Sequence, residues 1–423
     1  MTSHPALFTN CDLFVISSQY PPPNFAGRNN HKRTKTNYTM KKGFVISMFS
    51  AFVLSFALTS CTDNVVSDLS ADEQLTAERR FPQAPPAGNV YLIDNDASDN
   101  HVIGFDRGAD GSLSNMRTWS TGGAGTGGGL GSQSAVVRYL DYLLVVNAGS
   151  NQISAFRVNG QNLTLTDVED SHGVMPISLT AGRNMVYVLN AGGNGNIAGF
   201  MLSGQGDLTY ISGSSQPLST SSAGGAQIAF NSTSRLLVVT EKATNSLSVY
   251  SVDNLGVASA PTTYPSAGAT PFGFDFGRRD MIFVSEAAGG AAGASTLSSY
   301  KLNYTGTLDL ITGAMPTYQS AACWAVVSGN GQYGYLTNTG SANVTGFSIS
   351  PSGEVSLLNS GGATGSTGAG PIDAGFSRNS DFLYTLNAGS DSITMFAVGA
   401  DGSLYNLGEL TGLPNGAAGL AAE

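Results

Sequence analysis

Leu144-Val-Val-Asn147-Ala-Gly-Ser-Asn-Gln-Ile-Ser-Ala-Phe156 is one copy of a sequence motif that recurs along the chain, and this recurrence decides the fold. The motif holds an apolar β-rich run, a polar anchor, a Gly/Ser/Asn turn and an alternating strand that ends in an aromatic residue. A second copy reads Leu383-Tyr-Thr-Leu-Asn387-Ala-Gly-Ser-Asp-Ser-Ile-Thr-Met-Phe396. Self-similarity of this kind indicates a repeat architecture.

The spacing of the copies predicts the architecture. Their polar anchors are 43 to 52 residues apart, which is the period of a four-stranded propeller blade. Each copy but the first also has an opening strand, such as Pro271-Phe-Gly-Phe274, and the missing strand returns at the other end as Pro414–Leu420. We therefore predict an all-β, seven-bladed β-propeller over residues 89–423, closed by pairing of the C-terminal strand into the first blade. The seven anchors are Asp96, Asn147, Asn190, Glu241, Glu286, Asn338 and Asn387.

The first 61 residues have the pattern of a targeting segment and not of a folded domain. Residues 1–39 fit no signal pattern, and we expect them to be a mis-assigned upstream start. Residues 40–61 begin with a basic flank, continue with an apolar run and end in Leu-Thr-Ser-Cys61, which is typical of a signal peptide. A short membrane anchor that happens to contain a cysteine is the alternative.

The Leu-Thr-Ser-Cys61 ending resembles the lipobox of bacterial lipoproteins. The resemblance implies that Cys61 is acylated and inserts into membrane lipid, which places the protein in the cell envelope. Thr62, where an Asp would signal retention, resembles lipoproteins sorted to the outer membrane. The polar, Pro-containing residues 62–88 then form a flexible tether.

Charge and composition exclude several partners. Residues 62–423 carry 13 Lys and Arg against 28 Asp and Glu, so the surface repels phosphate backbones and we expect no nucleic-acid partner. His101 and His172 are the only histidines of this part, and we expect neither a metal site nor a cofactor. Residues 94–100 imitate a calcium loop but lack its Gly and distal Glu, so we expect a turn, with calcium as a minor alternative. The Gly-rich residues 121–131 are expected to be a flexible crossing between blades and not a phosphate loop.

The repeats resemble the seven-bladed lactonase family, which includes 6-phosphogluconolactonases and propeller-type carboxymuconate cyclases. Four segments carry the resemblance, which covers about residues 89–423: Leu144–Phe156, Leu237–Lys242, Thr270–Phe274 and Ala321–Trp324. It implies the fold strongly and the reaction weakly, because one fold hosts many functions. Cyclases of this family are thought to use His, Arg and Glu around the central channel, and those residues have no one-to-one match here.

The loops after the second strands of the blades are expected to meet at one mouth of the central channel. Two functions remain open for the residues at this mouth. In the first, a lactonase-type hydrolase, Glu241 and His172 form a base and its orienting partner beside Lys242 and Glu286. The lactone would be small and unphosphorylated, because the arginines lie on hairpins at the opposite mouth. In the second, the propeller is not catalytic and binds a glycan or a partner protein. The alternative for each of these candidate residues is a structural role, in a turn or in packing. Ligand binding at this mouth is assigned to Asn147, Asn190, Asn338, Asn387 and Trp324.

Overall fold

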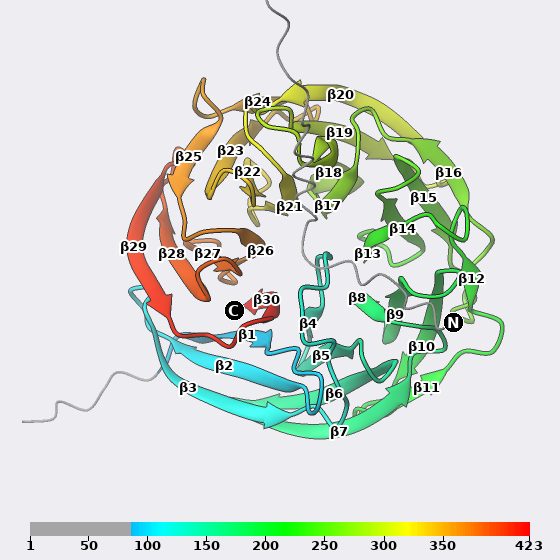
Figure 1. Cartoon of the computed structure of the whole chain (residues 1–423). Helices are drawn as coiled ribbons and strands as arrows, with labels where there is room; N and C mark the ends of the chain where they lie inside the picture. Colours follow the sequence, from blue (N-terminus) through cyan, green and yellow to red (C-terminus); the bar gives the residue numbers. More distant parts are fainter. Residues whose placement is uncertain (1–85) are drawn as a thin grey trace, which may run out of the picture. The chain divides into compact units, whose positions relative to one another are not determined.

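The computed structural model describes residues 86–423, which form seven antiparallel sheets arranged around a central axis (Figure 1). The predicted seven-bladed β-propeller is confirmed. The upstream segment 1–39, the signal peptide 40–61 and the tether up to residue 85 lie outside the described residues. Within residues 86–423, no helix is long and apolar enough to cross a membrane.

Each blade contains an inner, a second, a third and an outer strand, counted from the axis. The inner strands are β30 (Ala418–Ala422), β4 (Val136–Tyr139), β8 (Pro176–Gly182), β13 (Gly225–Phe230), β17 (Pro271–Phe276), β21 (Ala322–Val327) and β26 (Pro371–Phe376). The second strands are β1 (Gly88–Ile93), β5 (Tyr142–Asn147), β9 (Met185–Asn190), β14 (Leu236–Glu241), β18 (Met281–Glu286), β22 (Tyr333–Asn338) and β27 (Phe382–Asn387). The third strands are β2 (His101–Arg107), β6 (Gln152–Asn159), β10 (Asn196–Leu202), β15 (Ser246–Ser251), β19 (Thr296–Leu302), β23 (Asn343–Ile349) and β28 (Ser392–Val398).

The outer strands differ most between blades, and two of them are split into two pieces. They are β3 (Leu113–Ser120), β7 (Asn162–Asp170), β11 (Leu208–Tyr210) with β12 (Gln216–Pro217), β16 (Thr262–Pro265), β20 (Leu308–Pro316), β24 (Val355–Leu357) with β25 (Ala363–Ser366), and β29 (Leu404–Thr411). Two short 3-10 turns, η1 (Arg278–Asp280) and η2 (Ala288–Gly290), flank β18.

The position of a strand in its blade follows from its residue pattern. The second strands read as continuous apolar runs, and β5 and β14 are buried along their whole length. Neighbouring blades cover both faces of such a strand, so neither face needs polar residues. Most residues of the outer strand β29 are exposed, and its sequence is correspondingly more polar.

The ring closes as predicted, because β30 pairs antiparallel with β1 in the first blade. The predicted closing segment was Pro414–Leu420, whereas the strand spans Ala418–Ala422. The difference arises because residues 414–417 form a turn, in which the Ala417 N–H bonds to the Pro414 carbonyl at 3.3 Å.

Neighbouring blades are also joined by tyrosines of the second strands. A buried hydroxyl from one blade donates to the backbone carbonyl of a turn glycine in the next blade, which satisfies both groups away from water. Four blades use this contact: Tyr142 to Gly204 at 2.8 Å, Tyr187 to Gly256 at 2.6 Å, Tyr335 to Gly402 at 2.7 Å and Tyr384 to Gly111 at 2.9 Å.

The register sorts the loops onto two ends of the channel, as the sequence predicts. Inner strands begin where second strands end, since Pro271 pairs with Glu286 and Pro371 pairs with Asn387. We call this end the anchor mouth, and we call the end with the inner-to-second hairpins the hairpin mouth. In the first blade Asp94, and not the predicted Asp96, follows the second strand and bonds to the His101 N–H at 2.8 Å.

Candidate functional site

Glu241 ends β14 and is fully buried, with 0% of its surface exposed. Its carboxylate accepts hydrogen bonds from the Ser219 N–H at 3.0 Å, from the Thr244 hydroxyl at 3.0 Å and from the Ser248 hydroxyl at 2.8 Å. The Ser219 hydroxyl donates a fourth. A carboxylate has about four acceptor sites, so this one is occupied by its own blade and its neighbouring loop.

Glu286 occupies the same place at the end of β18 and is equally buried. The Ser266 hydroxyl at 3.0 Å, the Gly268 N–H at 2.8 Å and the Thr296 hydroxyl at 2.5 Å all donate to it. Neither anchor acid therefore presents a free oxygen to the channel, and both are placed to hold the start of their inner strand against the third strand.

The anchor amides that were assigned to ligand binding are fully buried as well. Three of them donate to the hydroxyl that lies seven residues later, on the third strand of the same blade. These bonds are Asn147 to Ser154 at 2.7 Å, Asn338 to Thr345 at 2.8 Å and Asn387 to Thr394 at 2.8 Å, while Asn190 donates to the Ser171 carbonyl at 3.0 Å. A ligand at the anchor mouth could reach these amides only by opening the blades.

His172 lies at the outer side of its blade and not beside Glu241. Its ring is exposed and stacks on Tyr210 of the outer strand β11, with the ring centroids 3.7 Å apart and 15° between the planes. The hydrogen bonds of the described residues do not join His172 to Glu241. The expected base and orienting partner are thus separated, because the His172 loop packs outward against its own blade.

Lys242 and Trp324 reach into the channel, where they bind an element that sequence reasoning missed. The Lys242 ammonium group donates to the Gly131 carbonyl at 2.8 Å and lies 4.6 Å from the centre of the Phe272 ring. The Trp324 indole N–H donates to the Ser132 carbonyl at 2.7 Å. Both partners belong to residues 130–134, which end the crossing from β3 to β4 and which we call the plug.

The plug extends from the start of the second blade toward the centre of the ring (Figure 1). Its Ser132 hydroxyl donates to the Ile177 carbonyl of the third blade at 2.7 Å. Its Gln133 amide donates to the Ala325 carbonyl of the sixth blade at 2.7 Å and accepts the Ala325 N–H at 3.1 Å. Residues 121–131 were expected to be a flexible crossing, yet the Gly127 N–H bonds to the Asn95 carbonyl at 2.8 Å and the Gly131 carbonyl accepts the bond from Lys242. The crossing is therefore held in place, and its plug is hydrogen-bonded to the third and sixth blades.

Polar side chains on several inner strands accept hydrogen bonds from backbone N–H groups of the inner strand in the next blade. The Phe230 N–H bonds to Thr180 at 3.0 Å, the Phe274 N–H to Gln227 at 2.6 Å and the Val327 N–H to Asp275 at 2.8 Å. Burial raises the pKa of Asp275 from 3.8 to about 6, against the lowering effect of its two backbone hydrogen bonds. Burial likewise raises the pKa of Asp373 well above its usual range.

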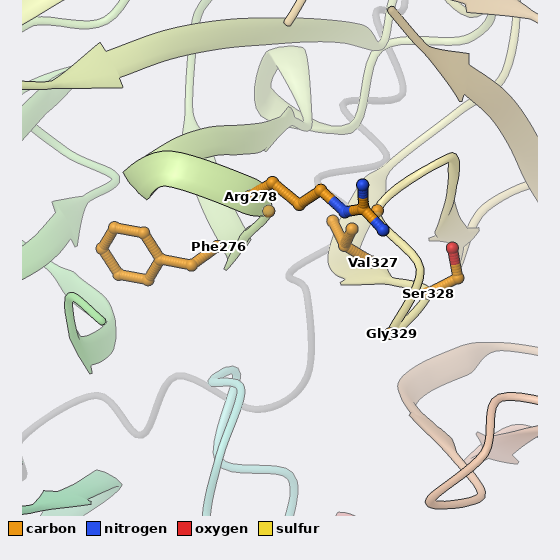
Figure 2. Close-up of a pocket in the computed structure, with 7 residues that line it drawn as sticks. Phe276, Arg278, Val327, Ser328 and Gly329 are labelled. Atoms are coloured by element: carbon orange, nitrogen blue, oxygen red, sulfur yellow. The ribbon is translucent and has the colours of Figure 1, made fainter. Parts of the chain in front are cut away.

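The hairpin mouth has a pocket of about 280 Å³ between the fifth and sixth blades (Figure 2). Asp275 lies directly behind it, because the Val327 and Phe276 N–H groups that it binds belong to pocket residues. Figure 2 shows the Arg278 side chain extended over Val327 beside the turn at Ser328 and Gly329. The lining residues are Phe276, Gly277, Arg278, Val327, Ser328, Gly329 and Gly331.

The loop at residues 94–100 is the predicted turn, since the Asp96 carboxylate accepts the Ser98 and Asp99 N–H groups. Among residues 86–423, no cluster of three or more His, Cys, Asp or Glu is placed to hold a metal ion.

The fold is similar to that of several solved structures. A "putative 6-phosphogluconolactonase" from Bacteroides fragilis superposes with a TM-score of 0.60 at 16% identity, covering 79% of this chain and 97% of that one. The periplasmic gluconolactonase of Pseudomonas aeruginosa gives 0.62 at 17% identity, covering 77% and 97%. A protein from Lactobacillus plantarum gives 0.63 at 16% identity, covering 79% and 98%. Identities this low show a shared lactonase-like propeller fold alone. No family model and no curated protein matches the chain.

Proposed function

We propose that this chain is a lipid-anchored propeller of the cell envelope that acts by binding, without catalysis at the anchor mouth, and that it receives its ligand at the hairpin mouth. One observation carries the proposal: the acids expected to be catalytic at the anchor mouth are buried and hydrogen-bonded, and Lys242 is bonded to the plug. The lipobox ending at Cys61 supports the anchoring, and Thr62 after it supports the outer-membrane location.

A second candidate, hydrolysis of a small unphosphorylated lactone, is favoured by Asp275. A carboxyl group with a pKa of about 6 is suited to act as a general base near neutral pH, and it lies behind the pocket that Arg278 lines. In that reaction the base takes a proton from water and the hydroxide adds to the lactone carbonyl. The ring C–O bond then breaks, and the base returns its proton to the leaving ring oxygen to give a hydroxy acid. The names of the Bacteroides and Pseudomonas proteins agree with this chemistry.

Lactone turnover separates the two candidates. The mature lipidated chain, purified in detergent, is incubated with a panel of neutral five- and six-membered sugar lactones, and acid release is followed at constant pH. We expect the buffer rate for every lactone. Turnover above that rate that is lost in Asp275→Asn and kept in Asp309→Asn, an exposed control, would replace the binding function with the hydrolase.

A further inference from the structure

We propose that the Arg278 pocket is a binding site for a small monoanionic carboxylate, such as a hydroxy acid of monosaccharide size. The inference rests on the proposed function in one respect, namely that the ligand enters from the hairpin mouth. It is carried by the hydrogen bonding, the shape and the neighbouring charges of the pocket.

Arg278 holds the unused donors of the pocket. Arg107, Arg117, Arg138 and Arg157 each bond to a carboxylate, a hydroxyl or a carbonyl, whereas the Arg278 guanidinium has no hydrogen bond or ion pair within the described residues. The backbone N–H groups around it are already bonded. These bonds run from Phe276 and Val327 to Asp275, from Gly277 to Met281, from Ser328 to Tyr333, from Gly329 to Ser380 and from Gly331 to Ser328.

The pocket fixes the direction of the Arg278 side chain. Its stem crosses from the fifth blade onto Gly331 of the sixth, where a Cβ atom would come within 2.8 Å of the Arg278 Cγ. Gly331 also has a φ of +65°, a conformation that side-chain-bearing residues rarely adopt. Glycine at this position therefore leaves the groove in which the arginine lies, and the guanidinium points over Val327 (Figure 2).

Size and charge limit the ligand. A volume of about 280 Å³ is at the lower edge of pockets for drug-sized molecules, so it fits a ligand of about one sugar ring. A guanidinium binds a carboxylate through two parallel hydrogen bonds. The carboxylate of Asp275 lies behind the pocket, and that of Asp280 follows on the same hairpin, where it accepts the Ser232 N–H at 2.9 Å. Arg278 is the only charged residue of the lining, so a monoanion is the ligand that this one arginine can balance.

Titration calorimetry on the mature chain tests the site, with sodium gluconate as the probe, glucose as its neutral counterpart and inorganic phosphate as the competing anion. We expect gluconate to bind, glucose to give no heat and phosphate to bind more weakly than gluconate. Arg278→Ala should weaken gluconate binding at least tenfold, and Arg278→Lys should weaken it less, because lysine keeps the charge and loses the paired geometry.

Arg183→Ala is the matched control. Arg183 is likewise exposed on an inner-to-second hairpin, makes no side-chain hydrogen bond or ion pair within residues 86–423, and lies outside the pocket lining. Its loss should change gluconate affinity less than twofold. Equal weakening in both alanine variants, an unchanged affinity in Arg278→Ala, or phosphate binding tighter than gluconate would overturn the site. Lactone turnover together with a weakened Arg278→Ala variant would keep the site and overturn only the proposed non-catalytic function.

Discussion

The indole N–H of Trp324 donates a 2.7 Å hydrogen bond to the carbonyl of Ser132, which lies 192 residues earlier in the chain. The bond spans the centre of the ring, from the sixth blade to the plug supplied by the second blade. In a propeller the blades otherwise contact only their neighbours, so bonds across the axis tie together sheets that would not meet. The plug is thus a structural element, and its removal should affect the whole ring.

Gln133→Ala tests the plug. The substitution removes two hydrogen bonds and leaves the buried Ala325 N–H and carbonyl without partners, which costs about 2–4 kcal/mol of unfolding free energy. Urea unfolding followed by circular dichroism measures the loss. Gln205→Ala, at an exposed turn, is the control and should unfold like the wild type. A Gln133→Ala protein within about 0.5 kcal/mol of wild type would show that the plug does not hold the ring.

Glu241→Gln distinguishes a structural acid from a catalytic one. Four donors point at the carboxylate, and the NH₂ group of glutamine cannot accept the hydrogen bonds of those that face it. We expect a loss of about 2–4 kcal/mol in stability and unchanged gluconate affinity in the folded fraction. Glu354→Gln, which alters an exposed glutamate, should change neither quantity. A stable Glu241→Gln protein that has lost ligand binding or turnover would restore the catalytic hypothesis.

The sequence predicted the fold well because the repeat carries its own evidence. The anchors and opening strands such as Pro271–Phe276 recur at one period, and the missing first strand implied closure by the C-terminal strand. The hydroxyl seven residues after an anchor, such as Ser154 after Asn147, was a visible signal that the anchors are satisfied within their own blade. The sequence alone does not show that this hydroxyl bonds to the anchor. Without that bond, Glu241 resembles a candidate base.

The plug could not be assigned from local sequence, because Gln133 bonds to residues far away along the chain. The available signal was length. The crossing from β3 to β4 spans residues 121–135, whereas the next one, from β7 to β8, spans only residues 171–175. An insertion that enters an inner strand has the channel beside it, and long structured insertions often have a role of their own. The Arg278 pocket was missed for a similar reason, since four of its seven lining residues come from another blade.

Deletion of residues 417–423 tests the closure of the ring. It removes β30 and leaves the edge of β1 unpaired, which exposes a template for pairing with other chains. We expect loss of the cooperative unfolding transition and growth of oligomers in size-exclusion chromatography. A synthetic peptide of residues 412–423 added in excess should restore the monomer, and a scrambled peptide should not. A truncated chain that stays monomeric with wild-type stability would contradict closure by this strand.

Asp275→Asn tests the half-buried acid behind the pocket through the pH dependence of stability. The folded-state pKa of Asp275 is about 6 against an ordinary 3.8, so the folded protein binds this proton more tightly than the unfolded chain does. Stability must then fall as the pH rises from about 4 to about 6, and stay lowered above it, by at most about 3 kcal/mol. Asparagine keeps one acceptor oxygen for the Val327 or Phe276 N–H and loses the other bond, at a cost of about 1 kcal/mol.

The variant should therefore be slightly less stable than wild type at pH 4 and more stable at pH 8, with the two curves crossing near pH 5. Urea unfolding at each pH unit from 4 to 8 measures both curves. Asp309→Asn, which alters an exposed residue of the outer strand β20, should leave the shape of the wild-type curve unchanged. Because all other titrating groups are shared by wild type and variant, their effects cancel in the difference between the two curves. A difference that is flat across this range would mean that Asp275 ionises as easily in the folded protein as in the unfolded chain, and it could then not serve as a base near neutral pH.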